Sequence, residues 1–402
     1  MKIVTLLLVT SFFLTITGCS KSEQPGSFTP KLIWKAPLLG GKEAFSFSPV
    51  VYKDFVIYSS KYARLDHSEK PKVVAFNKDT GAKIWEWDDA QSIQDHIQAS
   101  DAIYTFDNVL VMPTGARVYA IDMNTGKSLW STKEPEGGGH AIYGIGNTIY
   151  HVRSNFDKKK DILLKADIAT GNWKPVFIAE QQNMLSLIGN NMLTNKDTDG
   201  ENYLYFTYSH TNLQYTSSEL HLVKLNVRTD SVVFNKVLSN NNTYSITTID
   251  DKSIYLSGRE AISYSKNTGD LAKKYDLPSV QNRNYGAGQY ILNKNKLFAP
   301  TDFPRFICYD IESGSILWTE EGISTSVPSK LIYHDGIIYY TSGSDGFLHA
   351  IDENGKRLWK FQSPDKKGSS GNFDDAISID AAENRIYVSS YYNALCYETI
   401  KK

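Results

Sequence analysis

The sequence predicts an all-β protein, a single eight-bladed β-propeller of four-stranded antiparallel blades, and three observations predict it. The chain is rich in side chains that suit a pleated, half-buried surface, with 25 Tyr and 7 Trp among 402 residues. One phrase recurs along it with a spacing of mostly about 40 to 45 residues, the length of one four-stranded blade. A strand near the N-terminus supplies the piece that the last copy lacks.

The first eighteen residues are expected to be a signal peptide rather than part of the fold. Lys2 gives a positive start, and an apolar run from Ile3 to Ile16 follows. This run is shorter than the ~20 residues that a membrane-spanning helix needs.

The motif "ITGC" at the end of this run resembles the bacterial lipobox, which implies that Cys19 becomes the lipid-modified first residue of the mature protein. Ser20 follows, and by resemblance to enterobacterial lipoproteins a residue other than Asp there implies the outer membrane of a diderm bacterium. The polar, Pro- and Gly-containing residues 19–30 are expected to be a flexible tether, with the propeller over 31–402. Whether the protein faces the periplasm or the cell surface stays open.

The recurring phrase is clearest in "VYAIDMNTGKSLW", Val118 to Trp130. A strand ends at Asp or Asn, whose side chain accepts hydrogen bonds from the turn. A Gly that tolerates positive φ follows, and a second strand begins. The residues at the Gly position are Gly81, Gly126, Gly171, Asp230, Gly269, Gly314 and Gly355.

A Trp stands four residues after the turn Gly in the clear copies, and one Trp precedes the first copy. On an outer strand such a large flat side chain is expected to pack against the next blade. The predicted packing residues are Trp34, Trp85, Trp130, Trp318 and Trp359.

The ends of the chain decide the number of blades. After Trp359 the chain supplies three more strands and stops before a fourth, whereas Lys31 to Leu38 form a Trp-bearing strand with no hairpin before it. Pairing these two ends completes an eighth blade and removes an exposed sheet edge. A seven-bladed ring with residues 31 to 38 as an unattached arm is the alternative.

The phrase "YAIDMNTGKSLW" resembles the repeat of the PQQ-like, or quinoprotein-type, β-propellers over residues 31 to 402. Within that superfamily, a lipoprotein signal followed by one eight-bladed ring is similar to the BamB-type scaffold lipoproteins of outer-membrane β-barrel assembly. The resemblance implies protein partners, among them that assembly machinery, and a monomer held at the membrane by the lipid on Cys19. The formal net charge of −1 gives no basic face for nucleic acid.

The superfamily also contains PQQ-dependent dehydrogenases, which by resemblance need a vicinal Cys pair, a Ca²⁺ site and a catalytic Asp. The three Cys of this chain are not adjacent, and no CxxCH segment occurs. The recurrence of Asp at the turn, as at Asp122, Asp167, Asp310 and Asp352, indicates a structural role. We therefore predict no catalytic residue, no cofactor site and no metal site, and a protein that is not an enzyme.

Three residue sets with possible chemistry receive structural interpretations. Cys308 and Cys396 lie two blades apart, too far for a disulfide, and are predicted to be buried core residues. The segment 195–202, "NKDTDGEN", has the flavour of a Ca²⁺ loop but lacks the downstream Glu, so a structural Ca²⁺ there stays open. His96, His140 and His151 show no metal-ligand spacing and are expected on the surface or along the channel.

Irregular segments between the repeats are the expected binding surface, because the regular residues hold the ring together. The insertions at 61–72, 154–161 and 210–218 are predicted to be loops between the second and third strands. They share one face of the ring with the blade connections, such as 134–140 and 363–373. The function predicted from this arrangement is a non-catalytic scaffold, with a glycan- or peptide-binding sensory propeller as the alternative.

Overall fold

The computed structural model describes residues 30–38, 44–45, 47–62, 70–91, 103–114, 117–133, 141–155, 158–240, 245–257, 261–275, 290–300, 305–321, 331–341, 346–368 and 372–400. Within these ranges every regular element is a strand, and no helix is present that has the length and apolar character to cross a membrane. Cys19 and the predicted signal peptide lie outside the described residues.

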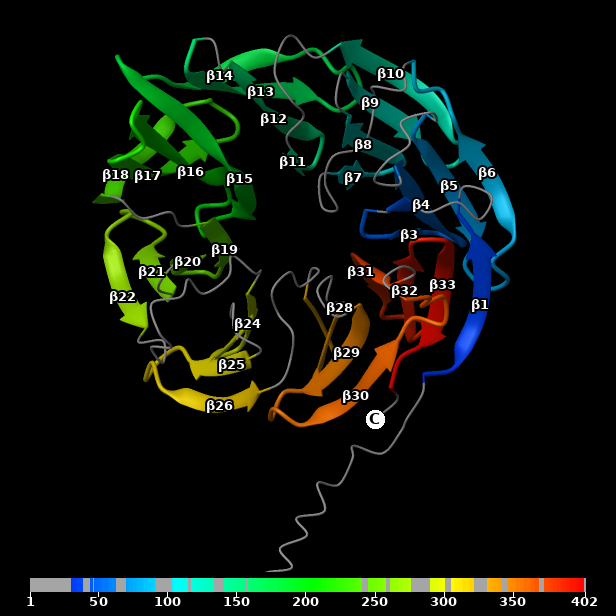
Figure 1. Ribbon diagram of the computed structural model, residues 1–402. Coiled ribbons are helices and arrows are strands. Elements are labelled where there is room, and N and C mark those ends of the chain that lie inside the picture. The colour runs from blue at the N-terminus through cyan, green and yellow to red at the C-terminus, as the bar shows by residue number, and fades with distance from the viewer. Residues whose placement is uncertain are drawn as a thin grey trace, which may run out of the picture.

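The described strands form eight sheets arranged as a ring around a central axis (Figure 1). Blades 1 to 4 contain, in turn, β2 (Ala44–Phe45), β3 (Val50–Tyr52), β4 (Phe55–Tyr62), β5 (Lys72–Asn77) and β6 (Lys83–Trp87); β7 (Tyr104–Phe106), β8 (Val109–Pro113), β9 (Arg117–Asp122) and β10 (Lys127–Lys133); β11 (Ile142–Ile145), β12 (Thr148–Asn155), β13 (Lys160–Asp167) and β14 (Lys174–Ala179); and β15 (Met184–Lys196), β16 (Asn202–Asn212), β17 (Ser218–Asn226) and β18 (Val232–Asn240).

Blades 5 to 8 contain, in turn, β19 (Ser245–Ile249), β20 (Ser253–Ser257), β21 (Ala261–Ser265) and β22 (Leu271–Tyr275); β23 (Ile291–Asn293), β24 (Lys296–Pro300), β25 (Arg305–Asp310) and β26 (Ile316–Glu321); β27 (Ile332–His334), β28 (Ile337–Thr341), β29 (Phe347–Asp352) and β30 (Arg357–Gln362); and β31 (Phe373–Asp380), β32 (Arg385–Ser390), β33 (Asn393–Glu398) and β1 (Leu32–Pro37). The predicted fold of eight four-stranded antiparallel blades is therefore confirmed. Blade 1 departs only in its inner strand, which is split into β2 and β3, both paired with β4.

The N-terminal strand closes the ring. β1 pairs with β33 along its length, from Leu32 opposite Tyr397 to Pro37 opposite Asn393, and the two ends of the colour scale meet there in Figure 1. The alternative of seven blades with a free arm is wrong. Pairing β1 with β33 covers the edge of blade 8, which would otherwise present unpaired backbone groups.

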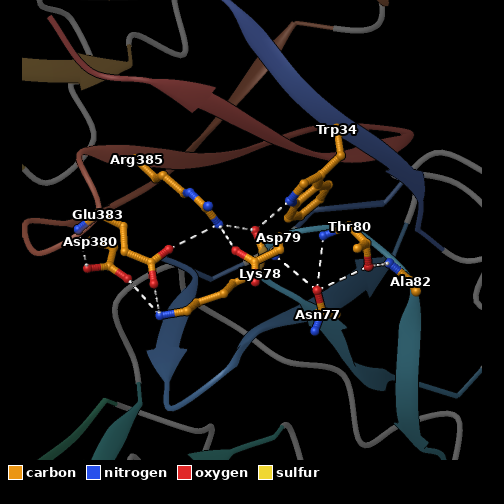
Figure 2. Close-up of polar contacts among 9 residues, drawn as sticks. All are labelled: Trp34, Asn77, Lys78, Asp79, Thr80, Ala82, Asp380, Glu383 and Arg385. Atoms are coloured by element: carbon orange, nitrogen blue, oxygen red, sulfur yellow. Dashed lines mark hydrogen bonds and ion pairs between the residues drawn. The ribbon is translucent and has the colours of Figure 1, made fainter.

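Polar contacts reinforce the junction between blades 8 and 1, which we call the seam (Figure 2). The carbonyl of Lys78 in blade 1 accepts hydrogen bonds from Trp34 Nε1 and Arg385 Nη1, each at 2.8 Å. The ammonium of Lys78 in turn pairs with Asp380 and Glu383 of blade 8. The seam thus joins residues more than 300 positions apart in sequence.

Antiparallel strands give the ring two different faces. The turn face carries the tight turns that join the first strand to the second and the third to the fourth, such as 53–54 and 123–126. The loop face carries the connections between second and third strands and between blades. The apolar core lies between the blades, in eight clusters of buried side chains, one for each junction between neighbouring blades.

Candidate functional site

The repeated turn is built as its residues require. At Asp122 and Asp352, one carboxylate oxygen accepts hydrogen bonds from backbone N–H groups of the turn that follows. The same holds for Asp167 and Asp310, which confirms the structural reading of all four aspartates. Gly126 has a φ of 69°, a conformation that favours glycine.

Four tryptophans dock on the turn of the following blade by one shared contact. The indole Nε1 donates to the backbone carbonyl three residues before the turn Gly, or two before it where the turn is shorter, and the ring covers that Gly. The donors and acceptors are Trp34 to Lys78 at 2.8 Å, Trp85 to Met123 at 3.0 Å, Trp130 to Ile168 at 2.8 Å and Trp318 to Glu353 at 3.0 Å.

Trp359 is the exception among the predicted packing residues. Its ring is 3% exposed and lies against Tyr339, with centroids 5.9 Å apart. Its indole N–H finds no acceptor among the described residues. Blade 8 offers no hairpin turn there, because its fourth strand comes from the other end of the chain.

In three consecutive junctions between blades, a lysine ammonium donates the hydrogen bond to the turn carbonyl in place of a Trp indole. Lys165 donates to the carbonyl of Val227 at 2.5 Å, Lys224 to that of Lys266 at 3.3 Å, and Lys273 to that of Ile311 at 3.2 Å. The three acceptor carbonyls stand at the same position of the turn as the Lys78 carbonyl that accepts from Trp34. Of the three lysines, only Lys273 stands four residues after its turn Gly, so only this one has a signal in the sequence.

Carboxylates accompany two of these lysine junctions. Asp230, at φ 59° in the turn of blade 4, pairs with Lys165 at 2.6 Å and Lys174 at 2.7 Å. Burial alone raises the pKa of the Asp230 carboxyl, but the hydrogen bonds from both lysines outweigh it and hold that pKa below its ordinary value.

In the segment 195–202, Asp197 forms ion pairs with lysines and is not arranged as a Ca²⁺ ligand. Asp197 pairs with Lys224 at 2.6 Å and Lys266 at 2.9 Å, and all three residues are less than 10% exposed. The hydroxyl of Tyr205 also donates to Asp197. A carboxylate held by two ammonium groups does not fit the ligand set of a Ca²⁺ ion.

The remaining candidate residues behave as core. Cys308 and Cys396 are buried, free thiols, as predicted. His151 is 2% exposed and its ring lies 5.8 Å from that of Trp173, so it does not line a channel as expected. His96 and His140 lie outside the described residues. No group of three or more His, Cys, Asp or Glu with a metal-binding arrangement occurs in the part of the chain that the structure describes.

The loop face carries a raised rim on blades 3 and 4, which we define as residues 153–155, 158–162 and 208–221. The second and third strands pair over eight residue pairs in blade 3 and nine in blade 4, against five in blade 7. Each extra pair adds about 3.3 Å, so the blade 4 hairpin extends roughly 13 Å farther than that of blade 7. Strands thus extend into both ends of two predicted loop insertions, 154–161 and 210–218, while 158–159 and 213–217 are turn or irregular chain.

The blade 4 hairpin carries a largely buried polar cluster within its last four residue pairs before the turn. The Ser186 hydroxyl lies 2.7 Å from His210 Nδ1, and His221 Nε2 lies 2.6 Å from a Glu219 oxygen. Tyr208 stacks on His221 with ring centroids 4.4 Å apart. Burial, followed by the charge of His221, lowers the pKa of His210. Ser186 is fully buried, so this Ser–His pair has no access to a substrate.

Blade 3 is hydrogen-bonded to β15, the strand that pairs with β16 beside this cluster. The backbone N–H of Ser186 donates to the carbonyl of Lys159 at 3.0 Å, and that of Ile188 donates to Asp161 at 2.7 Å. The blade 3 hairpin is thus hydrogen-bonded to β15, which pairs with β16 of the blade 4 hairpin, so the two raised hairpins form one connected ledge on the loop face. The sequence signalled the insertions, but not that they would extend the sheets.

The sequence profile of the family described as "Outer membrane protein assembly factor BamB" matches residues 27–207 and 258–390. The chain belongs to this family. Residues 208–257, which include most of the blade 4 hairpin and its tip, lie outside the match. A comparison with curated proteins returned no match.

Solved structures with the same fold include proteins of different kinds. The chain resembles BamB from Moraxella catarrhalis with a TM-score of 0.62 and 13% identity over 93% of this chain and 99% of that one. A europium-containing methanol dehydrogenase gives 0.65 and 15% over 89% and 84%, and the computationally designed Ika8 protein gives 0.64 and 15% over 92% and 100%. At these identities the likeness shows the fold alone.

Proposed function

We propose that this protein is a non-catalytic scaffold, anchored to the outer membrane through Cys19, that holds protein partners of outer-membrane β-barrel assembly on its loop face. In this proposal residues 1–18 are a cleaved signal peptide and 19–30 a tether. The propeller over 31–402 acts as a monomer.

The observation that carries the proposal is the raised rim on blades 3 and 4. Its polar groups are engaged with one another, and the ledge is tied together by backbone hydrogen bonds, so it supplies rigid area rather than reactive groups. Protein interfaces need area and well-placed anchors, and a pre-ordered surface costs little entropy on binding. Membership in the family named for outer membrane protein assembly supports the class of partner.

Crosslinking in intact cells, followed by affinity purification and mass spectrometry, tests the role. We expect the barrel component of the assembly machinery to be captured. Recovery of polysaccharide-utilisation proteins alone, with retention of the protein on a glycan column, would instead support the alternative of a glycan-binding propeller.

Two further assays test the anchor and the absence of catalysis. A Cys19→Ala variant should lose its diacylglyceryl group and leave the membrane fraction. Titration with PQQ and Ca²⁺ should give no stoichiometric uptake and no dye-linked alcohol oxidation; turnover would show a dehydrogenase instead.

A further inference from the structure

The tip of the blade 4 hairpin combines high exposure with a fixed shape. Tyr215 is 74% exposed and Leu213 is 45% exposed, at the end of the hairpin that extends farthest among those compared above. Such a pair on a projecting turn presents an apolar knob to the surroundings.

The tip is ordered by its own hydrogen bonds. The Asn212 side-chain oxygen accepts the backbone N–H of Thr216 at 2.8 Å and that of Ser217 at 3.2 Å, and its amide donates to the Thr216 hydroxyl. The Asn212 carbonyl also accepts the N–H of Tyr215, which has a φ of 57°. Because the turn is already ordered, little conformational entropy is lost when a partner covers it.

The charge pattern of the tip indicates what it fits. Residues 211–218 carry no charged side chain, in a chain of which 22% is charged. On the neighbouring blade 3 hairpin Lys159 is exposed, and its backbone carbonyl accepts the N–H of Ser186 in β15, the strand that pairs with β16 of the blade 4 hairpin. A convex, uncharged tip with a Tyr suits an apolar pocket, since Tyr is enriched among the anchors of protein interfaces.

We propose that Tyr215 and Leu213 are an anchor that inserts into an uncharged apolar pocket on a protein partner, with acidic groups beside that pocket facing Lys159. The inference rests on the proposed scaffold function and names the contact through which it works. The anchor lies in residues 208–257, so it is a feature of this chain outside the part matched by its family.

Full-length protein with p-benzoylphenylalanine at position 215, irradiated in cells, tests the contact. We expect a crosslink to the assembly protein that copurifies with the wild-type chain, through a residue in an apolar pocket. The dissociation constant of that purified protein is then measured for Tyr215→Asn, since Asn accepts the positive φ and keeps the turn. We expect about 10- to 30-fold weaker binding.

The control is Val237→Asn, on the outer strand of the same blade, where the side chain is 57% exposed. Binding should change less than about two-fold there, as for most residues outside an anchor. Lys159→Glu should weaken binding, and less so at high salt.

Unchanged binding by Tyr215→Asn overturns the anchor and leaves the scaffold function standing. A crosslink from position 215 to lipid, to a glycan or to a second copy of this chain also overturns it. Failure of the wild-type chain to copurify any assembly protein removes the proposed function and, with it, this inference.

Discussion

Two sides of the ring solve the same packing problem with different chemistry. In four junctions a Trp covers the turn of the next blade and donates its indole N–H to a fixed carbonyl. In the three consecutive junctions from blade 3 to blade 6 a lysine ammonium donates to the equivalent carbonyl. A Trp brings apolar area with its hydrogen bond, whereas a buried ammonium must be paired with a carboxylate or other acceptors.

The turn carbonyl, rather than the indole, is therefore the constant feature of each of these junctions. The lysine side also carries the two longest hairpins between second and third strands, and the residues outside the family match. The Trp contact is thus absent from the junctions that include the long hairpins and the residues outside the family match. The two sides should respond differently to truncation, to glycine substitution and to pH.

The largest effect is expected from Trp34→Ala, compared with Lys273→Ala. Trp34 is 7% exposed and closes the seam, so its removal leaves a cavity and should lower the free energy of unfolding by about 3–5 kcal/mol. Loss of the partly exposed Lys273 contact should cost about 1 kcal/mol or less. Urea denaturation of both variants measures the difference; equal losses would contradict the distinction between the two sides.

Asp197→Asn tests the buried charges of the lysine side. The substitution removes the carboxylate shared by Lys224 and Lys266, which are 5% and 2% exposed. It should lower the free energy of unfolding by about 3 kcal/mol. The matched control is Asp250→Asn in blade 5, whose carboxylate bonds a Tyr255 hydroxyl and a turn, and which should cost about 1 kcal/mol. A similar loss in both variants, measured by urea denaturation, would show that the ion pairs add little.

Two glycines with nearly the same backbone separate Trp from Lys docking. Gly126 and Gly314 have φ of 69° and 75°, so alanine costs each about 1–2 kcal/mol of backbone strain. At Gly126 a Cβ would lie 2.5 Å from Trp85, which adds about 1–3 kcal/mol. At Gly314 it meets only the flexible end of Lys273 at 3.1 Å. Gly126→Ala should therefore be the less stable variant in thermal unfolding.

The smallest effect is a pH dependence at Asp230, compared with Asp230→Asn, which retains the positive φ. Because the folded pKa of Asp230 is lowered, the carboxylate stabilises the fold above its ordinary pKa of ~4, and this contribution disappears as pH falls through the folded value. The stability advantage of the wild type, about 1 kcal/mol or less, should vanish at the acid end of that window. An advantage that persists there would mean that the pair with Lys165 and Lys174 is not its source.

The sequence repeats predict the blades, because each repeat contains the residues that form its own turn. Asp122 caps its own turn and Gly126 supplies positive φ within four residues, so short-range chemistry fixes the hairpin and the period fixes how many there are. The Trp positions and the closing strand around Trp34 follow from the same pattern. The family could be recognised on these residues.

The tertiary structure alone decided the contacts between residues distant in sequence. Lys165 and Lys224 reach the carbonyls of the next blade from third strands, and Asp197 meets two lysines instead of Ca²⁺, although nothing in the local sequence of these residues marks a partner. The insertion at 210–218 likewise predicts a loop, but pairing of β16 with β17 extends the sheet into it and leaves only 213–217 as the turn. Local propensity sets turns and strands, whereas ion pairs and sheet extension depend on which segments the closed ring brings side by side.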